Sequence, residues 1–302
     1  MFPALLAAFF FAASAVVSQR ATRIFGAVTA NFYRLAIACA VLGLATWVHD
    51  AGRGASSLHP ELFMRFFWSG LVGFGIGDVA LFLAYARLGS RLTILINWCS
   101  AALFAAAGDY WMRGRGLTPV QWGAVLCILS GLFVALWPSG AGKQVRHPIC
   151  GLLFAVIAGI SMGFGTALSG GAIDAANQQG IHVPGVSQAF QRASAGLIAA
   201  GLAFCYVSWS RRNAAPQPAK VWKHKPFWLL STALFGPVLG VSCYQWAQAA
   251  TGSSTIVVAI ASTSTLLVIP LARIMEKDHP GWRQMAGTLL AAAGVAALKF
   301  FG

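Results

Sequence analysis

The sequence predicts an all-helical integral membrane protein. Of its 302 residues, 58% are hydrophobic and 9% are charged, and its mean hydropathy of +0.71 lies well outside the range of soluble domains. A helix needs about 20 apolar residues to cross a bilayer. Ten such stretches follow one another, at 2–19, 27–48, 66–86, 92–112, 119–138, 149–171, 185–209, 227–249, 254–275 and 283–301. They leave little room for a soluble domain.

The ends and connections of these stretches fit hairpins between neighbouring membrane helices. No basic residue precedes the first stretch, and Arg20 and Arg23 follow it, which favours an uncleaved helix over a signal peptide. Most connections are shorter than about 15 residues. The longest polar one, SRRNAAPQPAKVWKHKP, concentrates Lys and Arg as cytoplasmic loops near anionic lipid do. We therefore assign the net charge of +14 to the lipid bilayer and expect no nucleic-acid partner.

The cysteine and histidine patterns predict neither a cofactor nor a metal site. The six cysteines lie in or beside apolar stretches without C-x-x-C spacing, and the six histidines fall in loops. The deep stretches hold a single acid, so they provide no Ser-His-Asp or metal constellation for an intramembrane enzyme. No nucleotide-binding P-loop is present, so we expect no direct use of ATP.

The second half of the chain repeats the first. A shift of 163 residues aligns the third to fifth stretches with the eighth to tenth and pairs Gly77 with Gly240, Gly89 with Gly252 and Ser90 with Ser253. Nearer the start of each half the shift is 158 residues. A unit of five helices is odd, so its second copy enters the membrane upside down. The predicted fold is two inverted five-helix repeats, 1–142 and 143–302, an arrangement that places a substrate site near the bilayer midplane in secondary transporters.

Several motifs carry a resemblance to a known family. F-x-R occurs at Phe32 and Arg34 and again at Phe190 and Arg192; ARLGS precedes the fourth stretch, AATGS precedes the ninth, and LTPVQWGAVLCILSGL forms the fifth. In these features the chain resembles an EamA-type member of the drug/metabolite transporter superfamily over essentially its full length. The resemblance implies secondary transport through a cavity lined chiefly by the first, third, fourth, sixth, eighth and ninth helices, in the cytoplasmic (inner) membrane of a bacterium.

The chain departs from its relatives at two places. Where the family commonly has an acid before the fifth helix of each repeat, the first copy has Arg115 and the second has Asp278. Small multidrug relatives carry a glutamate in their first helix, and here that region offers Ser14 and Ser18, with Ser161 in the repeat. Exchange of protons for cationic drugs by that mechanism is therefore disfavoured.

The distribution of basic residues predicts an orientation. Fourteen Lys and Arg residues fall in the odd-numbered connections, against five on the other side. The positive-inside rule then places the odd connections in the cytoplasm and both termini outside. Similar family members are usually described with both termini inside, and for this chain we keep the residue count.

Asp78 is the leading candidate for a functional residue. An ionisable side chain deep in a bilayer costs at least about 2.5–3.5 kcal/mol, so it usually faces a cavity, a partner or water. Helical spacing puts Phe82 and Tyr85 on the same face. Asp78 either contacts a cationic group of the substrate, or titrates as a proton site, or has a structural role as a cap or an arginine's partner. The 163-residue shift adds three cavity candidates, Tyr244, Gln245 and Gln248.

Further candidates divide into three kinds. Asn97 and Trp98 in the fourth stretch, with Ser262 and Thr263 in the ninth, are expected to line the cavity, although Ser and Thr commonly bond their own helix backbone. Four residues are bend points for gating or sites of close packing: Gly73, Gly77, Pro237 and Gly240. Arg34 and Arg192 either bind a carboxylate or phosphate, or snorkel or pair structurally.

The leading functional hypothesis is a secondary transporter of a small polar metabolite, an exporter of amino acids or similar compounds, in which substrate and direction rest on family analogy. One alternative is a carrier of nucleotide-sugars or lipid-linked groups, which needs paired basic residues in the cavity. Only Arg34 and Arg192 are available, and we expect both to lie too near the membrane surface. The other alternative is a membrane partner subunit that does not transport.

Overall fold

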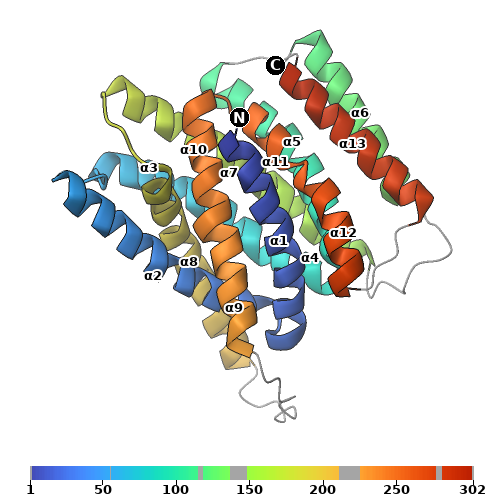
Figure 1. The fold of residues 1–302 in the computed structure, drawn as a ribbon, viewed down its shortest axis with the longest axis horizontal. Coiled ribbons are helices and arrows are strands. Elements are labelled where there is room, and N and C mark those ends of the chain that lie inside the picture. The colour runs from blue at the N-terminus through green and yellow to red at the C-terminus, as the bar shows by residue number, and fades with distance from the viewer. Residues whose placement is uncertain are drawn as a thin grey trace.

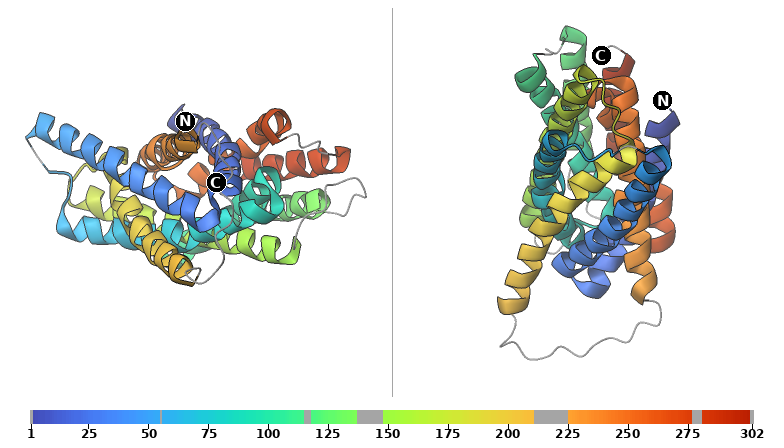
Figure 2. Two further views of the ribbon diagram at one scale, coloured as in Figure 1. Left: turned by 90° about the horizontal axis from the view of Figure 1, so that it is seen from below. Right: turned by 90° about the vertical axis from the view of Figure 1, so that its left-hand side faces the viewer.

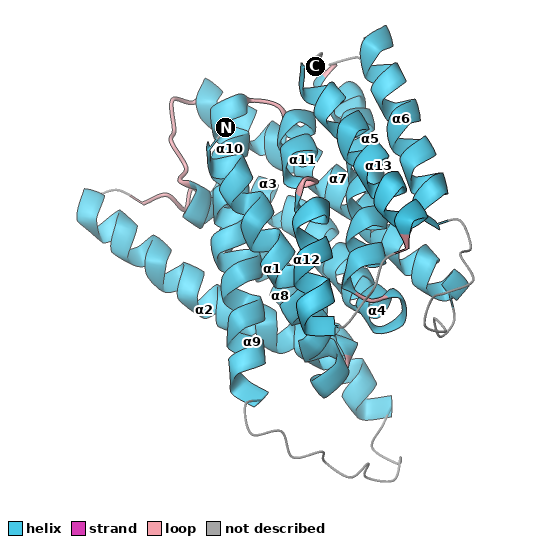
Figure 3. Ribbon diagram, turned by 45° about the vertical axis from the view of Figure 1, so that its right-hand side comes forward, coloured by secondary structure: helices cyan, strands magenta, loops and turns pink. Residues whose placement is uncertain are grey.

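The computed structural model of the chain describes residues 2–54, 56–114, 118–136, 148–210, 225–276 and 281–300. Throughout these residues the chain forms helices joined by short loops, without a strand (Figure 1; Figure 3). Seven of the described helices are long and apolar enough to cross a bilayer. The prediction of an all-helical membrane protein is confirmed. Arg115, Asp278 and several of the basic connections used for the orientation lie outside the described residues.

Helices cover the five stretches predicted in the first half as far as the described residues extend, which is to Leu136. They are α1 (Phe2–Phe25), α2 (Ala27–Arg53), α3 (Pro60–Gly70), the π-helical segment η1 (Leu71–Asp78), α4 (Val79–Leu88), α5 (Ser90–Arg113) and α6 (Pro119–Leu136). Elements α3, η1 and α4 run on without a break as one apolar span, Pro60–Leu88. This span begins before residue 66, the start that hydropathy predicts, because Pro60 is well suited to the first turn of a helix.

The second half follows the same plan. Its elements are α7 (Pro148–Gln178), α8 (Gly185–Ser210), α9 (Lys225–Ala233), the π-helical segment η2 (Leu234–Gly240), α10 (Val241–Thr251), α11 (Ser254–Ala261), α12 (Ser264–Glu276) and α13 (Trp282–Phe300). Elements α9, η2 and α10 are continuous. The prediction of one unbroken helix over 254–275 is wrong, because a turn at Ser262 and Thr263 separates α11 from α12.

The two π-helical segments occupy the same register of the internal repeat. Leu71 and Leu234, where η1 and η2 begin, are separated by the 163-residue shift found in the sequence. In η2, Pro237 has no backbone N–H to donate to Ala233, which disfavours regular α-helix there. Both segments are rich in glycine, and π-helical turns of this kind are frequent at functional sites. The repeat therefore extends from sequence to an unusual local structure.

Left-handed glycines mark a second equivalent point in the two halves. Gly89, between α4 and α5, has a φ angle of 81°, and Gly252, after α10, has a φ angle of 66°. These are the glycines of the ARLGS and AATGS motifs. Residues with a Cβ rarely adopt this region, so glycine allows the sharp change of direction between successive helices.

The pattern of helix contacts stays the same when each helix is replaced by its equivalent in the other half. Helix α6 packs against α13 at one edge of the molecule, and α2 packs against α8 toward the opposite edge (Figure 1). Between these edges α5 packs against α7, and α1 packs against α11 and α12. The repeat relates α1 to α7, α2 to α8, α5 to α11 and α12, and α6 to α13. Exchanging the halves therefore maps this set of contacts onto itself.

Glycines in α7 allow a close approach to α5 beside the centre of the molecule. A Cβ on Gly159 would lie 2.6 Å from the carbonyl oxygen of Asn97, and one on Gly163 would lie 2.7 Å from that of Ala101. Spacing of small residues by four places them on one helix face, the usual basis of tight packing between membrane helices. The approach brings Met162 beside Asn97, whose Nδ2 lies 3.4 Å from the Met162 sulfur.

Candidate functional site

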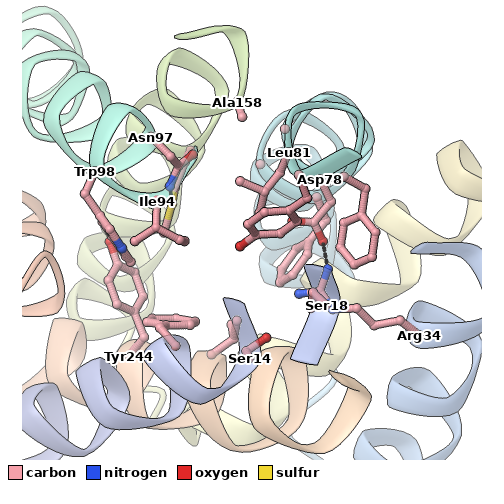
Figure 4. A pocket seen from close by; sticks show the side chains of 18 of the residues that line it. Ser14, Ser18, Arg34, Asp78, Leu81, Ile94, Asn97, Trp98, Ala158 and Tyr244 are labelled. Carbon is pink, nitrogen blue, oxygen red and sulfur yellow. Dashed lines mark hydrogen bonds and ion pairs between the residues drawn. The ribbon is translucent and has the colours of Figure 1, made fainter. Parts of the chain in front are cut away.

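A pocket of about 80 Å³ lies between the two halves of the chain (Figure 4). Most of its wall is apolar, as in typical small-molecule sites. Its lining residues come from eight elements: Phe11, Ser14, Ser18, Arg34, Gly73, Phe74, Gly77, Asp78, Leu81, Phe82, Tyr85, Ile94, Asn97, Trp98, Ala158, Met162, Thr166, Arg192, Val241 and Tyr244. Within the described residues no group of three His, Cys, Asp or Glu side chains is arranged to hold a metal ion.

Asp78 forms a buried ion pair with Arg34 at the pocket wall. Nη1 of Arg34 donates a hydrogen bond of 2.8 Å to Oδ2 of Asp78 (Figure 4), and the two side chains are 6% and 11% exposed, respectively. The Arg34 guanidinium also lies over the ring of Phe82, 5.2 Å from its centroid. The structural pairing considered for Asp78 is thus present, and the same carboxylate also faces the cavity.

Arg192 reaches the pocket from α8. It is 4% exposed, and its Nη1 donates to Oε1 of Gln245 at 2.6 Å. Gln245 in turn donates to Ser169 at 2.6 Å and to Gln188 at 3.1 Å. Among the described residues no carboxylate lies within ion-pair distance of Arg192, and its Nε has no hydrogen-bond partner. Both Arg34 and Arg192 line the buried pocket, although we expected from the sequence that they would lie too near the membrane surface to serve it.

The two arginines occupy equivalent places in the two halves. Nη2 of Arg34 lies 2.8 Å from the position that a Cβ on Gly236 would take, and Nη2 of Arg192 lies 3.0 Å from that of a Cβ on Gly73. Gly73 belongs to η1 and Gly236 to η2. Each arginine therefore crosses to the π-helical segment of the other half. A Cβ at Gly236 would require the guanidinium group of Arg34 to shift, and one at Gly73 would be in tight contact with that of Arg192.

Aromatic residues form the wall opposite the ion pair. The Phe11 ring lies 5.5 Å from that of Trp98 and 5.8 Å from that of Tyr244, measured between centroids. The Tyr244 hydroxyl shares a hydrogen bond of 3.0 Å with the hydroxyl of Thr166. Figure 4 shows Trp98 and Tyr244 on one side of the cavity and Asp78 on the other. A ligand in the cavity would therefore contact charged groups on one side and aromatic faces on the other.

Most of the residues that the sequence singles out line this pocket. They are Asp78, Phe82, Tyr85, Asn97, Trp98, Tyr244, Gly73, Gly77, Arg34 and Arg192. Two further candidates, Pro237 and Gly240, lie in η2 and do not line it. They were predicted as bend points or sites of close packing, and they lie where the helix departs from regular α-helical geometry.

Four predicted cavity residues are directed elsewhere. Gln245 supports Arg192, as described above, and Gln248 donates to the carbonyl oxygen of Thr166 at 2.8 Å. The hydroxyls of Ser262 and Thr263 bond carbonyl oxygens of their own chain three residues earlier, at 2.9 and 2.7 Å. These two therefore stabilise the turn between α11 and α12, which is the backbone role that serine and threonine commonly take in membrane helices.

The family resemblance predicts that the first helix lines the cavity, but the residues of α1 that do so were not among the predicted cavity residues. Phe11, Ser14 and Ser18 line the pocket, and the Ser18 hydroxyl is hydrogen-bonded to that of Thr232. The signal was present, because two serines four residues apart share one face of an otherwise apolar helix. We used these serines only as replacements for the glutamate of multidrug relatives.

A second charged cluster joins the two halves at one end of the bundle. Arg113 donates through Nε to Asp174 at 2.8 Å, through Nη1 to Asp109 at 3.0 Å and through Nη2 to the carbonyl oxygen of Gly252 at 2.8 Å. Asp109 also accepts from the Thr255 hydroxyl at 3.2 Å. The cluster ties α5 and α7 to the turn between α10 and α11. The start of α1 lies toward the same end (Figure 1).

Comparison with known proteins gives a family and a fold. The chain matches the sequence model described as the EamA-like transporter family twice, over residues 1–137 and 149–300. No match is found among curated proteins. A solved structure titled only "Crystal structure of protein" is 19% identical, covers 98% of this chain and 96% of its own, and superposes with a TM-score of 0.64. At this identity the likeness shows the fold alone.

Proposed function

The chain belongs to the EamA-like transporter family, and on that premise we propose that it exports a small polar metabolite, an amino acid or a similar compound, by alternating access. Proteins of this family are membrane transporters of the drug/metabolite type. The observation that carries the proposal is the pocket: it is buried between the two halves and contains three charged side chains, Arg34, Asp78 and Arg192. Buried charge inside a membrane protein is costly and is typical of a substrate or ion pathway.

Ten membrane crossings, arranged as inverted repeats over 1–142 and 143–302, are part of the proposal. The equivalent π-helical segments, the equivalent left-handed glycines and the exchangeable helix contacts all support it. The start of α1 and the end of α13 lie toward the same end of the bundle (Figure 2), which requires an even number of crossings. Two copies of a five-helix unit give ten crossings, which is an even number. Because five is odd, the second copy starts on the opposite side of the membrane and is inverted relative to the first.

Alternating access requires the pocket to be closed to one side of the membrane at a time. In this structure the Arg113 cluster bonds the two halves to each other at the end of the bundle at which α1 begins, so we assign to it the closing of that end. Opening that end breaks the bonds from Arg113 to Asp174 or to Gly252. The glycines and proline of η1 and η2 weaken the helices at mid-span, so we assign the bending to these segments.

The pocket favours a small zwitterion over the larger substrates considered. A nucleotide-sugar needs two free cations for its diphosphate, whereas Asp78 already neutralises Arg34. A partner subunit that does not transport has no use for buried charges around a cavity. We place the protein in the cytoplasmic (inner) membrane of a bacterium, with both termini outside.

Counterflow into proteoliposomes tests this function. Vesicles loaded with unlabelled amino acid should accumulate the same radiolabelled amino acid above protein-free vesicles, for at least one of the twenty L-amino acids. Trp98→Leu should abolish accumulation because Trp98 forms the aromatic wall. Trp209→Leu is the matched control, because Trp209 is 69% exposed and does not line the pocket. The absence of counterflow with all twenty compounds would refute amino-acid transport.

A further inference from the structure

We propose that Arg192 binds a carboxylate of the transported compound, so that the negative group of the substrate, more than its ammonium group, selects it. This inference rests on the proposed transport function and adds the recognition chemistry. It concerns the carboxylate end of the ligand and the side of the pocket at which Arg192 lies.

Among the described residues, the surroundings of Arg192 provide hydrogen-bond partners but no carboxylate at ion-pair distance. Its guanidinium is buried, lines the pocket and bonds the neutral amide of Gln245. Its Nε has no hydrogen-bond partner. A guanidinium has five donors in a planar fork that matches a carboxylate, and a charge-assisted pair of this kind is stronger than a bond to a neutral group. Arg192 is therefore a buried cation with unused donors at a cavity.

The internal repeat shows where a carboxylate is missing. Arg34, the equivalent of Arg192, is neutralised by Asp78 from the same half of the chain. The residue equivalent to Asp78 under the 163-residue shift is Val241, which also lines the pocket. The second half thus keeps the arginine and replaces its acid with an apolar residue. A carboxylate supplied by the substrate would restore in the second half the neutralisation that Asp78 provides in the first.

The charge balance of the pocket agrees with this assignment. Arg34, Asp78 and Arg192 together carry one net positive charge, so the carboxylate end of a ligand is attracted to the pocket and the ammonium end is not. The ammonium group of an amino acid has no unpaired acid of the lining to bind, and it would meet the hydroxyls of Ser14 and Ser18 or the aromatic faces. Removing the carboxylate should therefore weaken binding more than removing the ammonium group.

Binding measurements with matched ligands test the proposal. The melting temperature of the purified protein in detergent is measured against the twenty L-amino acids, their carboxamides and the corresponding deaminated acids. For every amino acid that stabilises the protein, the carboxamide should bind about 10- to 100-fold more weakly, the range expected for loss of a hydrogen bond to a charged group. The deaminated acid should keep most of the affinity.

Variants separate Arg192 from the rest of the pocket. Arg192→Gln should remove the preference for acid over carboxamide, and Arg192→Lys should retain part of it because the charge remains. The double variant Arg34→Gln with Asp78→Asn removes the other charges as a pair and should retain the preference. Arg87→Gln is a control for loss of an arginine, because Arg87 lies outside the pocket and bonds the carbonyl oxygen of Leu83.

The possible failures point to different conclusions. If acid and carboxamide bind wild-type protein equally, or if Arg192→Gln keeps the preference, the role of Arg192 is wrong while the transport function stands. If no amino acid binds and none shows counterflow, the transport function itself is wrong and this inference falls with it. If Arg192→Gln does not fold, the acid-to-carboxamide ratio in wild-type protein and in Arg192→Lys still decides.

Discussion

Replacing Asp78 by Asn should destabilise the protein more than replacing Asp78 and Arg34 together. The two groups are 2.8 Å apart and almost fully buried. At an effective dielectric constant of about 20, unit charges at this distance attract by about 6 kcal/mol, which desolvation largely offsets. Removing one partner of a buried pair typically costs about 3–5 kcal/mol because the other charge stays behind. Asn can still accept one bond from Arg34, so we expect a loss near 3 kcal/mol.

The free energy of unfolding in mixed micelles, followed by tryptophan fluorescence, measures this loss. The single variants Asp78→Asn and Arg34→Gln should each lose about 3 kcal/mol or more, and the double variant should lose less than either. Glu61→Gln is the control. Its ion pair with Arg65 has a similar length of 3.0 Å, but the side chains are more than half exposed. Its removal should therefore cost less than about 0.5 kcal/mol.

Two results would contradict this reasoning. An Asp78→Asn variant as stable as wild type would mean that the buried pair does not contribute to the fold. A double variant that loses the sum of the two single losses would mean that Asp78 and Arg34 act independently, in which case the carboxylate does not neutralise the arginine. The second result would also remove the contrast with Arg192.

Three further predictions follow from the structure. Gly70→Ala should abolish folding or strongly destabilise the protein, because its Cβ would lie 2.1 Å from a backbone oxygen of α8. Gly171→Ala is the control: its Cβ would have no atom within 4 Å, so the free energy of unfolding should be unchanged or slightly higher. Asp174→Asn should weaken the Arg113 cluster. A cysteine introduced into the pocket lining by Ser14→Cys should then react faster with a reagent applied from that side than the same cysteine in the presence of Asp174; unchanged labelling would argue against a closing role. A fluorescent protein that is silent in the periplasm, fused after Gly302, should stay dark, and a bright signal would reverse the proposed orientation.

Much of the fold follows from hydropathy, and the remainder depends on local backbone chemistry. Apolar length predicts where helices form, because a bilayer span needs about 20 apolar residues regardless of their order. The turn that divides 254–275 was not predicted, because Ser262 and Thr263 are as compatible with a membrane helix as with a turn. Hydropathy likewise gives no sign of the π-helical segments. Their glycines and Pro237 predict a weak point but not the kind of helix that results.

The candidate site could be predicted only where its residues share one helix face. Asp78, Phe82 and Tyr85 follow helical spacing, and all three line the pocket. The inward course of the arginines could not be predicted from spacing, because it depends on glycines in the other half of the chain. The position of a residue along a helix can be predicted from one sequence. The direction of a long side chain cannot, because it depends on whether a segment distant in the sequence leaves space for it.

The differences between the two halves separate structural from functional residues in this protein. Where the halves agree, as at Gly73 and Gly236 or at the two arginines, the residues build the same backbone path and the same crossing of a guanidinium group. Where they differ, the pocket gains its asymmetry: Asp78, Phe82 and Tyr85 line it, while their equivalents Val241, Gln245 and Gln248 supply an apolar contact and two buried amides. A strictly symmetric pocket would present the same charges to both halves and could not orient a polar ligand. Val241 stands where the repeat has Asp78, so Arg192 has no ion-pair partner among the described residues, and under the proposed role of Arg192 this difference fixes the direction of a negatively charged group in the cavity.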